Sequence, residues 1–185
     1  MLMIKTERIT IAGFGGQGIM TLGQIIAHTA AKMDLNSLWF PSYGPETRGG
    51  TANCAVIVSK MQINSPVFSK ANTLIAFNKP SLEKFYQKVE NEGRILYNSS
   101  LIDTTLCLKG PSVYGIPINS MANDLGNIRV ANMIMLGAYL QLVPIFNDDI
   151  IKEVLQEYLG KKRQDLLDIN LLAIKQGKEF IKEGS

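Results

Sequence analysis

The sequence predicts an α/β fold, a single three-layer α/β/α domain built on a mostly parallel or mixed sheet. Short runs of β-branched and apolar residues alternate along the chain with segments whose apolar residues recur at helical spacing. A glycine-rich turn joins the first such run to the first helical segment. Strands that alternate with helices are typical of a sheet covered by helices. The chain has 185 residues and shows no linker, repeat or low-complexity tract, so we expect one domain over residues 1–185.

The first predicted strand and helix enclose a glycine turn. Arg8–Ala12 is a β-branched run, Ile19–Met33 has helical spacing, and Gly13-Phe14-Gly15-Gly16-Gln17-Gly18 lies between them. The glycines match the GxGxxG pattern, in which backbone N–H groups at a helix N-terminus approach an anion such as phosphate. A dinucleotide fold also needs an Asp or Glu at the end of the second strand, about 20 residues later. That strand, Ser37–Phe40, is followed by Pro41-Ser42-Tyr43 without an acid. We therefore expect no self-contained NAD or FAD site, although the turn can still face an anion.

A second glycine-rich segment joins the predicted strands Ser37–Phe40 and Ala52–Ser59. It reads Tyr43-Gly44-Pro45-Glu46-Thr47-Arg48-Gly49-Gly50. Its glycines and proline permit backbone shapes that other residues resist, and loops held by strands often carry function. The Arg48 guanidinium suits an oxyanion, with Glu46 orienting it. A solvated ion pair and an interface contact are the alternatives.

The remaining segments continue the alternation of strands and helices. Further strands are expected at Thr73–Phe77, Arg94–Asn98 and Val113–Pro117. Helices are expected from Asn78 to about Glu92, ending at Gly93, and then at Val130–Val143, Ile150–Leu159 and Asp168–Glu183. Pro144 ends the second of these helices, and Asn147 is placed to cap the third. The helix Val130–Val143 is apolar nearly all round, so we expect it in the core or against a partner.

The composition excludes several kinds of partner and site. Nineteen basic and sixteen acidic residues are intermixed and leave a net charge of +3, so neither nucleic acid nor a membrane surface is expected as a partner. No apolar core of signal-peptide length precedes Gly13. The most apolar stretch, Met133–Phe146, is shorter than the roughly 20 residues of a membrane-spanning helix. We expect a cytoplasmic protein.

Three single residues are weighed as chemical candidates. Cys54 and Cys107 lie in apolar runs without CxxC spacing, which is typical of buried thiols in a reducing compartment and cannot alone supply a metal or iron–sulfur site. His28 has no visible acid partner, so we expect a core or surface histidine rather than a catalytic base. We therefore predict no catalytic residue, no metal site and no cofactor on this chain.

Two small groups of residues each allow two structural roles. Trp39, Phe40 and Tyr43 form either an exposed aromatic patch for partners or a strand end in the core. Arg129, with Asn127 and Asn132, either caps the helix that starts near Val130 or lines a subunit interface, and capping is favoured. The apolar helix and the aromatic group together predict association with larger subunits, and self-association when the chain is isolated.

These motifs resemble the gamma subunit of 2-oxoacid:ferredoxin oxidoreductases. The resemblance is carried by Gly13–Gly18, by Trp39–Glu46 with Arg48-Gly49-Gly50, and by Gly126-Asn127-Ile128-Arg129-Val130-Ala131-Asn132-Met133. It extends from Ile9 to about Gly177, and implies the fold of the gamma domain of pyruvate:ferredoxin oxidoreductases. The sequence of Trp39–Glu46 is most similar to gamma chains of the 2-oxoglutarate type. It is less similar to gamma chains of enzymes that use branched-chain 2-oxoacids or pyruvate.

The resemblance implies a non-catalytic subunit of a larger enzyme. In that family the complex converts a 2-oxoacid and CoA to an acyl-CoA, CO2 and reduced ferredoxin. Thiamine diphosphate, Mg and the iron–sulfur clusters belong to partner chains, which are the thiamine-binding alpha and beta subunits and a ferredoxin-like delta subunit. The gamma chain helps to form the CoA side of the site. The candidate CoA-side or interface residues are Gly13, Gly15, Gly16, Gln17, Gly18, Tyr43, Gly44, Glu46, Arg48, Gly49 and Gly50.

Two other functions stand beside this one. The chain is alternatively an autonomous Rossmann-like nucleotide-binding oxidoreductase, or a stand-alone binding or scaffold protein. Copurification separates the three hypotheses. The first predicts brown, cluster-bearing partners, the second predicts a bound nucleotide, and the third predicts neither.

Overall fold

A six-stranded mixed sheet organises the computed structural model, which describes residues 6–42, 52–103, 110–160 and 163–184. The strand order is β2-β3-β1-β4-β5-β6, where β1, β4, β5 and β6 run parallel and β3 is antiparallel to both of its neighbours. The strands are β1 (Glu7–Gly13), β2 (Asn36–Ser42), β3 (Ala52–Ser59), β4 (Ala71–Ala76), β5 (Val89–Asn98) and β6 (Ser112–Ile116). The predicted α/β fold with a mixed sheet is therefore confirmed.

The position of β3 separates this sheet from a dinucleotide-binding sheet. In that fold the second strand lies directly beside the first. Here β3 lies between β1 and β2, with Ile9 of β1 opposite Val56 and Trp39 of β2 also opposite Val56. The glycine turn after β1 thus belongs to a different topology, although it carries the same glycine spacing.

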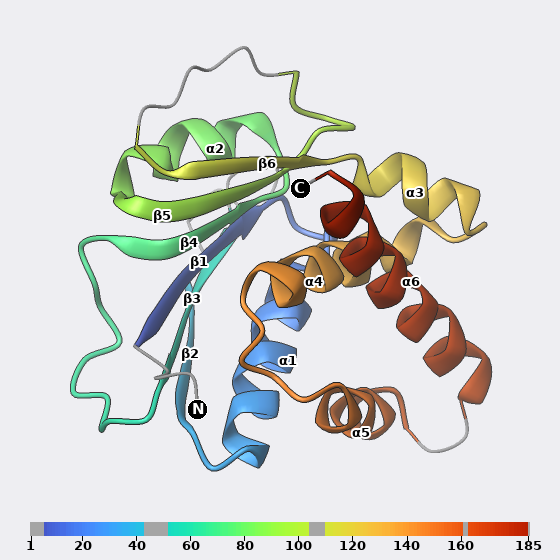
Figure 1. Ribbon diagram of the computed structural model, residues 1–185, viewed down its shortest axis with the longest axis horizontal. Helices are drawn as coiled ribbons and strands as arrows, with labels where there is room; N and C mark the ends of the chain where they lie inside the picture. The colour runs from blue at the N-terminus through green and yellow to red at the C-terminus, as the bar shows by residue number, and fades with distance from the viewer. Residues whose placement is uncertain (1–5, 43–51, 104–109, 161–162, 185) are drawn as a thin grey trace.

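The helices cover the two faces of the sheet unequally (Figure 1). On one face lies the larger core, in which Ile11, Ile75 and Leu96 of the sheet meet the helices. On the other face a smaller cluster around Leu74 and Ile95 is covered by α2 (Lys79–Phe85) and the short 3-10 helix η1 (Tyr86–Lys88). The helices on the first face are α1 (Ile19–Lys32), α3 (Ile118–Asp124), α4 (Ala131–Leu142), α5 (Asp148–Leu159) and α6 (Gln164–Glu183).

Helix α4 lies in the core and crosses α6 at backbone contact. Its residues from Asn132 to Leu140 are all buried, which confirms that this apolar helix belongs inside the fold. A Cβ atom on Gly137 would come 2.8 Å from the carbonyl carbon of Ile174. One on Gly177 would come 2.9 Å from the backbone nitrogen of Ala138. Two glycines therefore let the two helices touch without intervening side chains.

The helix expected from Asn78 to Glu92 was the main error in the predicted elements. Asn78 does cap it, since its side chain accepts a hydrogen bond from Ser81 N, but α2 ends at Phe85 and β5 already begins at Val89. Gly93 lies inside this strand and has Asn72 O 2.8 Å from its would-be Cβ. Pairing with β4 outweighs the local helical pattern here, because strand pairing depends on residues distant in sequence.

The C-terminal helices differ from expectation mainly at their ends. Asn147 caps α5 as predicted, with its Oδ1 accepting from Asp149 N at 2.7 Å. Helix α6 starts at Gln164, one turn before the predicted Asp168. Within the described part of the chain, no helix is long and apolar enough to cross a membrane.

Candidate functional site

The glycine turn leaves β1 and starts α1 through two left-handed glycines. Gly16 has φ +91° and Gly18, the N-cap of α1, has φ +75°, a region that favours glycine. The Gln17 side chain closes the turn, because its Oε1 accepts from Phe14 N at 2.7 Å and from Asn78 Nδ2 at 3.2 Å. The first N–H groups of α1 have no partner inside the helix. The turn therefore presents donors of the kind that bind an anion.

Lack of space for a side chain explains the glycine at position 13 but not the one at position 15. A Cβ on Gly13 would come 2.7 Å from Gln17 Oε1 and 2.9 Å from Phe77 Cβ. At Gly15 nothing lies within 4 Å of a would-be Cβ among the described residues. Gly15 is exposed, so a ligand or a partner is free to approach it.

The segment before α4 folds back onto this turn. Asn132 donates from Nδ2 to Gly18 O at 3.3 Å, across 114 residues of sequence. Asn127 accepts from Arg129 N at 3.1 Å and so caps the short 3-10 helix η2 (Ile128–Val130). Asn127 thus caps η2 and not the predicted helix itself, because α4 begins after Val130 without a side-chain cap. Asn132 anchors the turn. Arg129 lines the cleft described next, and a place at a subunit interface stays a prediction for it.

A cleft of about 670 Å³ opens between the glycine turn, η2 and the helices α5 and α6. This volume is in the range of small-molecule sites. Its polar lining comes from the turn and from amide side chains at Asn119, Asn127 and Asn170, and its apolar lining includes Leu155 and Leu166. Among the described lining residues Arg129 is the charged one, which gives the cleft a positive character. Such a lining suits binding of an anionic ligand rather than bond-making chemistry.

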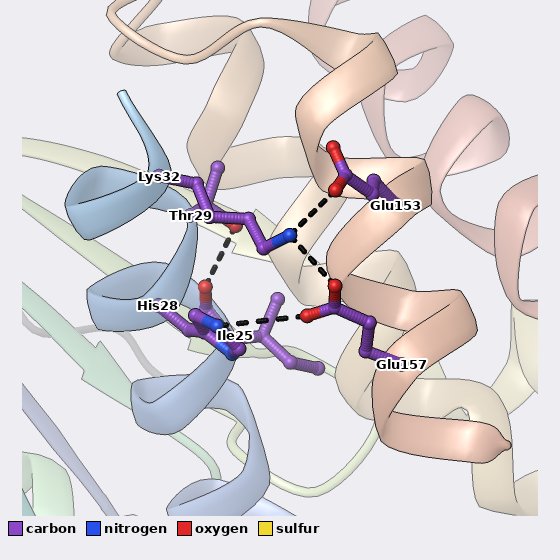
Figure 2. A network of polar contacts seen from close by, with 6 residues as sticks. All are labelled: Ile25, His28, Thr29, Lys32, Glu153 and Glu157. Atoms are coloured by element: carbon purple, nitrogen blue, oxygen red, sulfur yellow. Dashed lines mark hydrogen bonds and ion pairs between the residues drawn. The ribbon is translucent and has the colours of Figure 1, made fainter. Parts of the chain in front are cut away.

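Polar contacts hold α5 against α1 and so fix one wall of the cleft (Figure 2). Lys32 Nζ lies 2.6 Å from Glu153 Oε1 and 2.7 Å from Glu157 Oε1, and these carboxylates raise the pKa of Lys32. His28 Nε2 lies 3.7 Å from Glu157 Oε2. His28 was expected either in the core or at the surface, and it lies at the surface. It does have an acid partner, Glu157, which the sequence did not reveal. Both side chains are about half exposed, outside the cleft lining, which indicates a helix contact rather than a base.

The aromatic and cysteine candidates near α1 are mostly packing residues. Cys54 is fully buried, its Sγ contacts Ile19 O at 3.7 Å, and burial raises the pKa of its thiol to about 12. Trp39 packs on the main core, whereas Phe40 on the other face is 48% exposed. The packing role expected for Cys54 is confirmed. Cys107 lies outside the described residues.

The loop that carries Tyr43, Gly44, Glu46, Arg48, Gly49 and Gly50 lies outside the described residues. Its two anchors are described. Ser42 at the end of β2 pairs with Asn53, and Ala52 at the start of β3 pairs with Gly13. The chain thus enters and leaves the loop at the sheet edge where the glycine turn begins.

A metal or cluster site finds no support in the described part of the chain. Histidine, cysteine and carboxylate side chains there do not gather in groups of three or more. The described cysteine, Cys54, is a free buried thiol.

Comparison with known proteins places these features in a family context. The model of the family described as pyruvate ferredoxin/flavodoxin oxidoreductase matches residues 8–180. Ketoisovalerate oxidoreductase subunit VorA of Methanothermobacter thermautotrophicus is 36% identical over 180 residues, which are 95% of this chain and 36% of that protein. The 2-oxoglutarate synthase subunit KorC of Methanocaldococcus jannaschii is 31% identical over 183 residues, with 96% and 95% covered.

Solved structures of 2-oxoacid:ferredoxin oxidoreductases also match this chain. The 2-oxoglutarate:ferredoxin oxidoreductase from Magnetococcus marinus, with 2-oxoglutarate, coenzyme A and succinyl-CoA bound, matches with a TM-score of 0.89 and 28% identity over 97% of this chain and 32% of that chain. The gamma subunit of a keto/oxoacid ferredoxin oxidoreductase from Geobacter sulfurreducens matches with a TM-score of 0.81 and 26% identity, over 96% and 99%. The chain spans about a third of VorA and of the Magnetococcus chain, and nearly all of KorC and of the Geobacter chain.

Proposed function

The chain belongs to the pyruvate ferredoxin/flavodoxin oxidoreductase family, and from this premise we propose that it is the gamma-type subunit of a 2-oxoacid:ferredoxin oxidoreductase complex. The complex would oxidise a 2-oxoacid in the presence of CoA, form acyl-CoA and CO2, and pass two electrons to ferredoxin. Residues 1–185 form one gamma-type domain of this assembly, in the cytoplasm. The match to the gamma subunit from Geobacter sulfurreducens over nearly its whole length supports this assignment.

The observation that carries the proposal is the cleft at the glycine turn. CoA brings a diphosphate and a 3′-phosphate, and the cleft is lined both by the turn, with its helix N-terminal N–H groups, and by Arg129. Gly15 and Gly16 leave the backbone exposed for close approach. This chain therefore binds and orients CoA from its phosphate end. In the related Magnetococcus enzyme, coenzyme A is among the bound molecules.

The second glycine loop is assigned to the same side of the site. Its anchors Ser42 and Ala52 lie at the sheet edge that carries Gly13. Arg48 is then a second phosphate-binding group, with Glu46 orienting it.

The redox groups are assigned to partner subunits. An iron–sulfur cluster needs several thiolates, whereas the described thiol of Cys54 is buried, protonated and alone. The described residues thus do not fit a cluster, and thiamine diphosphate with Mg is placed on the alpha and beta subunits. A ferredoxin-like delta subunit completes the complex.

The 2-oxoacid is proposed to be 2-oxoglutarate. The sequence of Trp39–Glu46 favours 2-oxoglutarate. The overall identity is higher to the ketoisovalerate subunit VorA, at 36%, than to the 2-oxoglutarate subunit KorC, at 31%. Recognition of the acid belongs mainly to the thiamine-binding subunits. Assaying the native complex with 2-oxoglutarate, 2-ketoisovalerate and pyruvate decides the point. A higher kcat/KM with either of the other acids overturns this choice but leaves the subunit assignment intact.

Copurification from the native host tests the subunit assignment. A tagged chain is expected to bring down larger subunits with the brown colour of iron–sulfur clusters and with CoA-dependent 2-oxoacid oxidation. A chain that purifies alone, or with a tightly bound nucleotide and its own dehydrogenase activity, contradicts it.

A further inference from the structure

The side chain of Gln17 is held by the carbonyl end of its amide. Its Oε1 accepts hydrogen bonds from Phe14 N at 2.7 Å and from Asn78 Nδ2 at 3.2 Å. Both partners are N–H groups, so the atom between them is the amide oxygen, and Nε2 lies at the other end of the amide. No described residue accepts a hydrogen bond from this Nε2 group. Gln17 therefore has two N–H donors that the described fold does not use.

These donors belong to a residue of the cleft. Gln17 is half-buried and lines the cleft between Gly16 and Gly18. Hydrogen bonds from N–H groups to an ionised oxygen are shorter and stronger than bonds between neutral groups. The Gln17 amide thus adds a side-chain donor to the backbone N–H groups of the turn and to Arg129, which lines the same cleft.

Asn78 lies behind the turn and sets the direction of the Gln17 amide. It is buried, with 3% of its surface exposed. Its Oδ1 accepts from Ser81 N at 2.9 Å and so caps α2, which leaves Nδ2 as the end that meets Gln17. Asn78 is not among the described lining residues of the cleft. Its effect on a ligand there therefore passes through Gln17.

The fold brings these two residues together at the ends of neighbouring strands. β1 and β4 are adjacent and parallel, and Phe77 N, just after β4, donates to Ala12 O at 2.9 Å. The chain leaves β1 for α1 on one face of the sheet and leaves β4 for α2 on the other face (Figure 1). Ligands of open α/β sheets bind outside the carboxyl ends of the strands at such a point. Phe77 also lines the cleft, so the cleft lies there.

We propose that Gln17 donates from Nε2 to a phosphate oxygen of CoA, and that Asn78 is the positioning residue that keeps this amide turned toward the cleft. The inference deepens the proposed function and rests on it, because the ligand is the CoA assigned to this cleft. Without Asn78 Nδ2, one of the two hydrogen bonds that hold the Gln17 oxygen inward is lost. The amide then turns more freely, and affinity falls because its oxygen repels the phosphate whenever it faces the cleft.

The direct test changes the donor itself. Gln17→Glu keeps an oxygen for Phe14 N and for Asn78 Nδ2 but replaces the donating Nε2 by a second oxygen. In steady-state ferredoxin reduction by the complex reassembled from this chain and the purified remaining subunits, we expect the KM for CoA to rise about tenfold or more, with kcat nearly unchanged. Gln156→Glu makes the same exchange on the exposed surface of α5, outside the cleft lining, and should leave the KM within about twofold.

The positioning role needs a variant that leaves the cleft lining intact. Asn78→Ser removes Nδ2, adds no charge and keeps a residue type that caps helices well. Loss of one neutral hydrogen bond should raise the KM for CoA about three- to tenfold, again with kcat nearly unchanged. Asn147→Ser makes the same exchange at the cap of α5 and should leave the KM within about twofold.

A double-mutant cycle separates positioning from a general effect on the fold. In a Gln17→Met chain the amide that Asn78 positions is absent, so Asn78→Ser should raise the KM for CoA no further. An equal rise in that chain shows that Asn78 acts by another route and overturns its role. A lower melting temperature of Asn78→Ser without a change in KM overturns it as well.

The outcomes separate this inference from the proposed function. If the unmodified chain restores no CoA-dependent turnover to the remaining subunits, the proposed function itself fails. If it restores turnover, and Arg129→Ala raises the KM for CoA while Gln17→Glu leaves it within about twofold, the cleft binds CoA without the Gln17 amide. The inference is then overturned and the proposed function stands.

Discussion

Replacing Arg129 with alanine removes the charged group among the described residues of the cleft. A hydrogen bond to a charged group contributes about 1.5–3 kcal/mol, and each 1.4 kcal/mol is a factor of ten, so loss of a phosphate contact weakens CoA binding about 10- to 100-fold. Arg129 is exposed in this chain, and water weakens exposed charge pairs. We therefore expect the lower end, about a tenfold rise in the KM for CoA, with a smaller change for the 2-oxoacid.

The assay is steady-state ferredoxin reduction at varied CoA, on a complex shown to be intact by size-exclusion chromatography. Arg163→Ala is the matched control, because Arg163 lines a separate cavity between α5 and α6. The same assay on Arg48→Ala tests the second glycine loop, with a rise of tenfold or more expected there too. An unchanged KM for CoA in an intact Arg129→Ala complex refutes the role of the cleft in phosphate binding.

Three further predictions concern the fold and its buried groups. Gly177→Ala forces a methyl group into the backbone of α4 and should lower the free energy of unfolding, measured in urea, by about 3 kcal/mol. The control Gly184→Ala, whose added Cβ has its nearest contact at 3.5 Å, should change it by less than about 0.5 kcal/mol. Equal stabilities of the two variants would disprove the backbone contact. Burial raises the pKa of Glu7 above 4.5, so the folded chain holds this proton to higher pH than the unfolded chain. Stability should then fall as the pH rises from 4.5 through the folded-state pKa, and Glu7→Gln should flatten that decline in pH-dependent melts. With Cys107 changed to serine, Cys54 should resist iodoacetamide at pH 8 until the chain is denatured, because its thiol pKa is about 12; rapid labelling of the native chain would contradict its burial.

Local patterns predicted the elements whose causes are local. The turn between β1 and α1 follows from glycines at positions that need positive φ, and Gly16 and Gly18 have it. The burial of α4 follows from an apolar surface on all its sides. Asn147 caps α5 because its side chain reaches a backbone N–H two residues on.

Features that depend on contacts between residues distant in sequence were not predicted. β5 starts at Val89 because it pairs with β4, and the helical pattern up to Glu92 carries no trace of that pairing. His28 meets Glu157 through the packing of α5 on α1. Arg129 and the glycine turn line one cleft, and the nearby bond from Asn132 to Gly18 joins these distant segments. The sequence signal for it was the run Gly126–Met133, which carries part of the family resemblance.

Omission of this chain from the reassembled complex tests the central claim most directly. The measurement is CoA-dependent reduction of ferredoxin by 2-oxoglutarate, with the partner subunits alone, with this chain alone, and with both. We predict that the isolated chain is colourless and inactive, that the partners alone lose CoA-dependent turnover, and that adding the chain restores it. Full CoA-dependent activity without this chain, or oxidoreductase activity and visible absorbance from the chain by itself, would contradict the assignment.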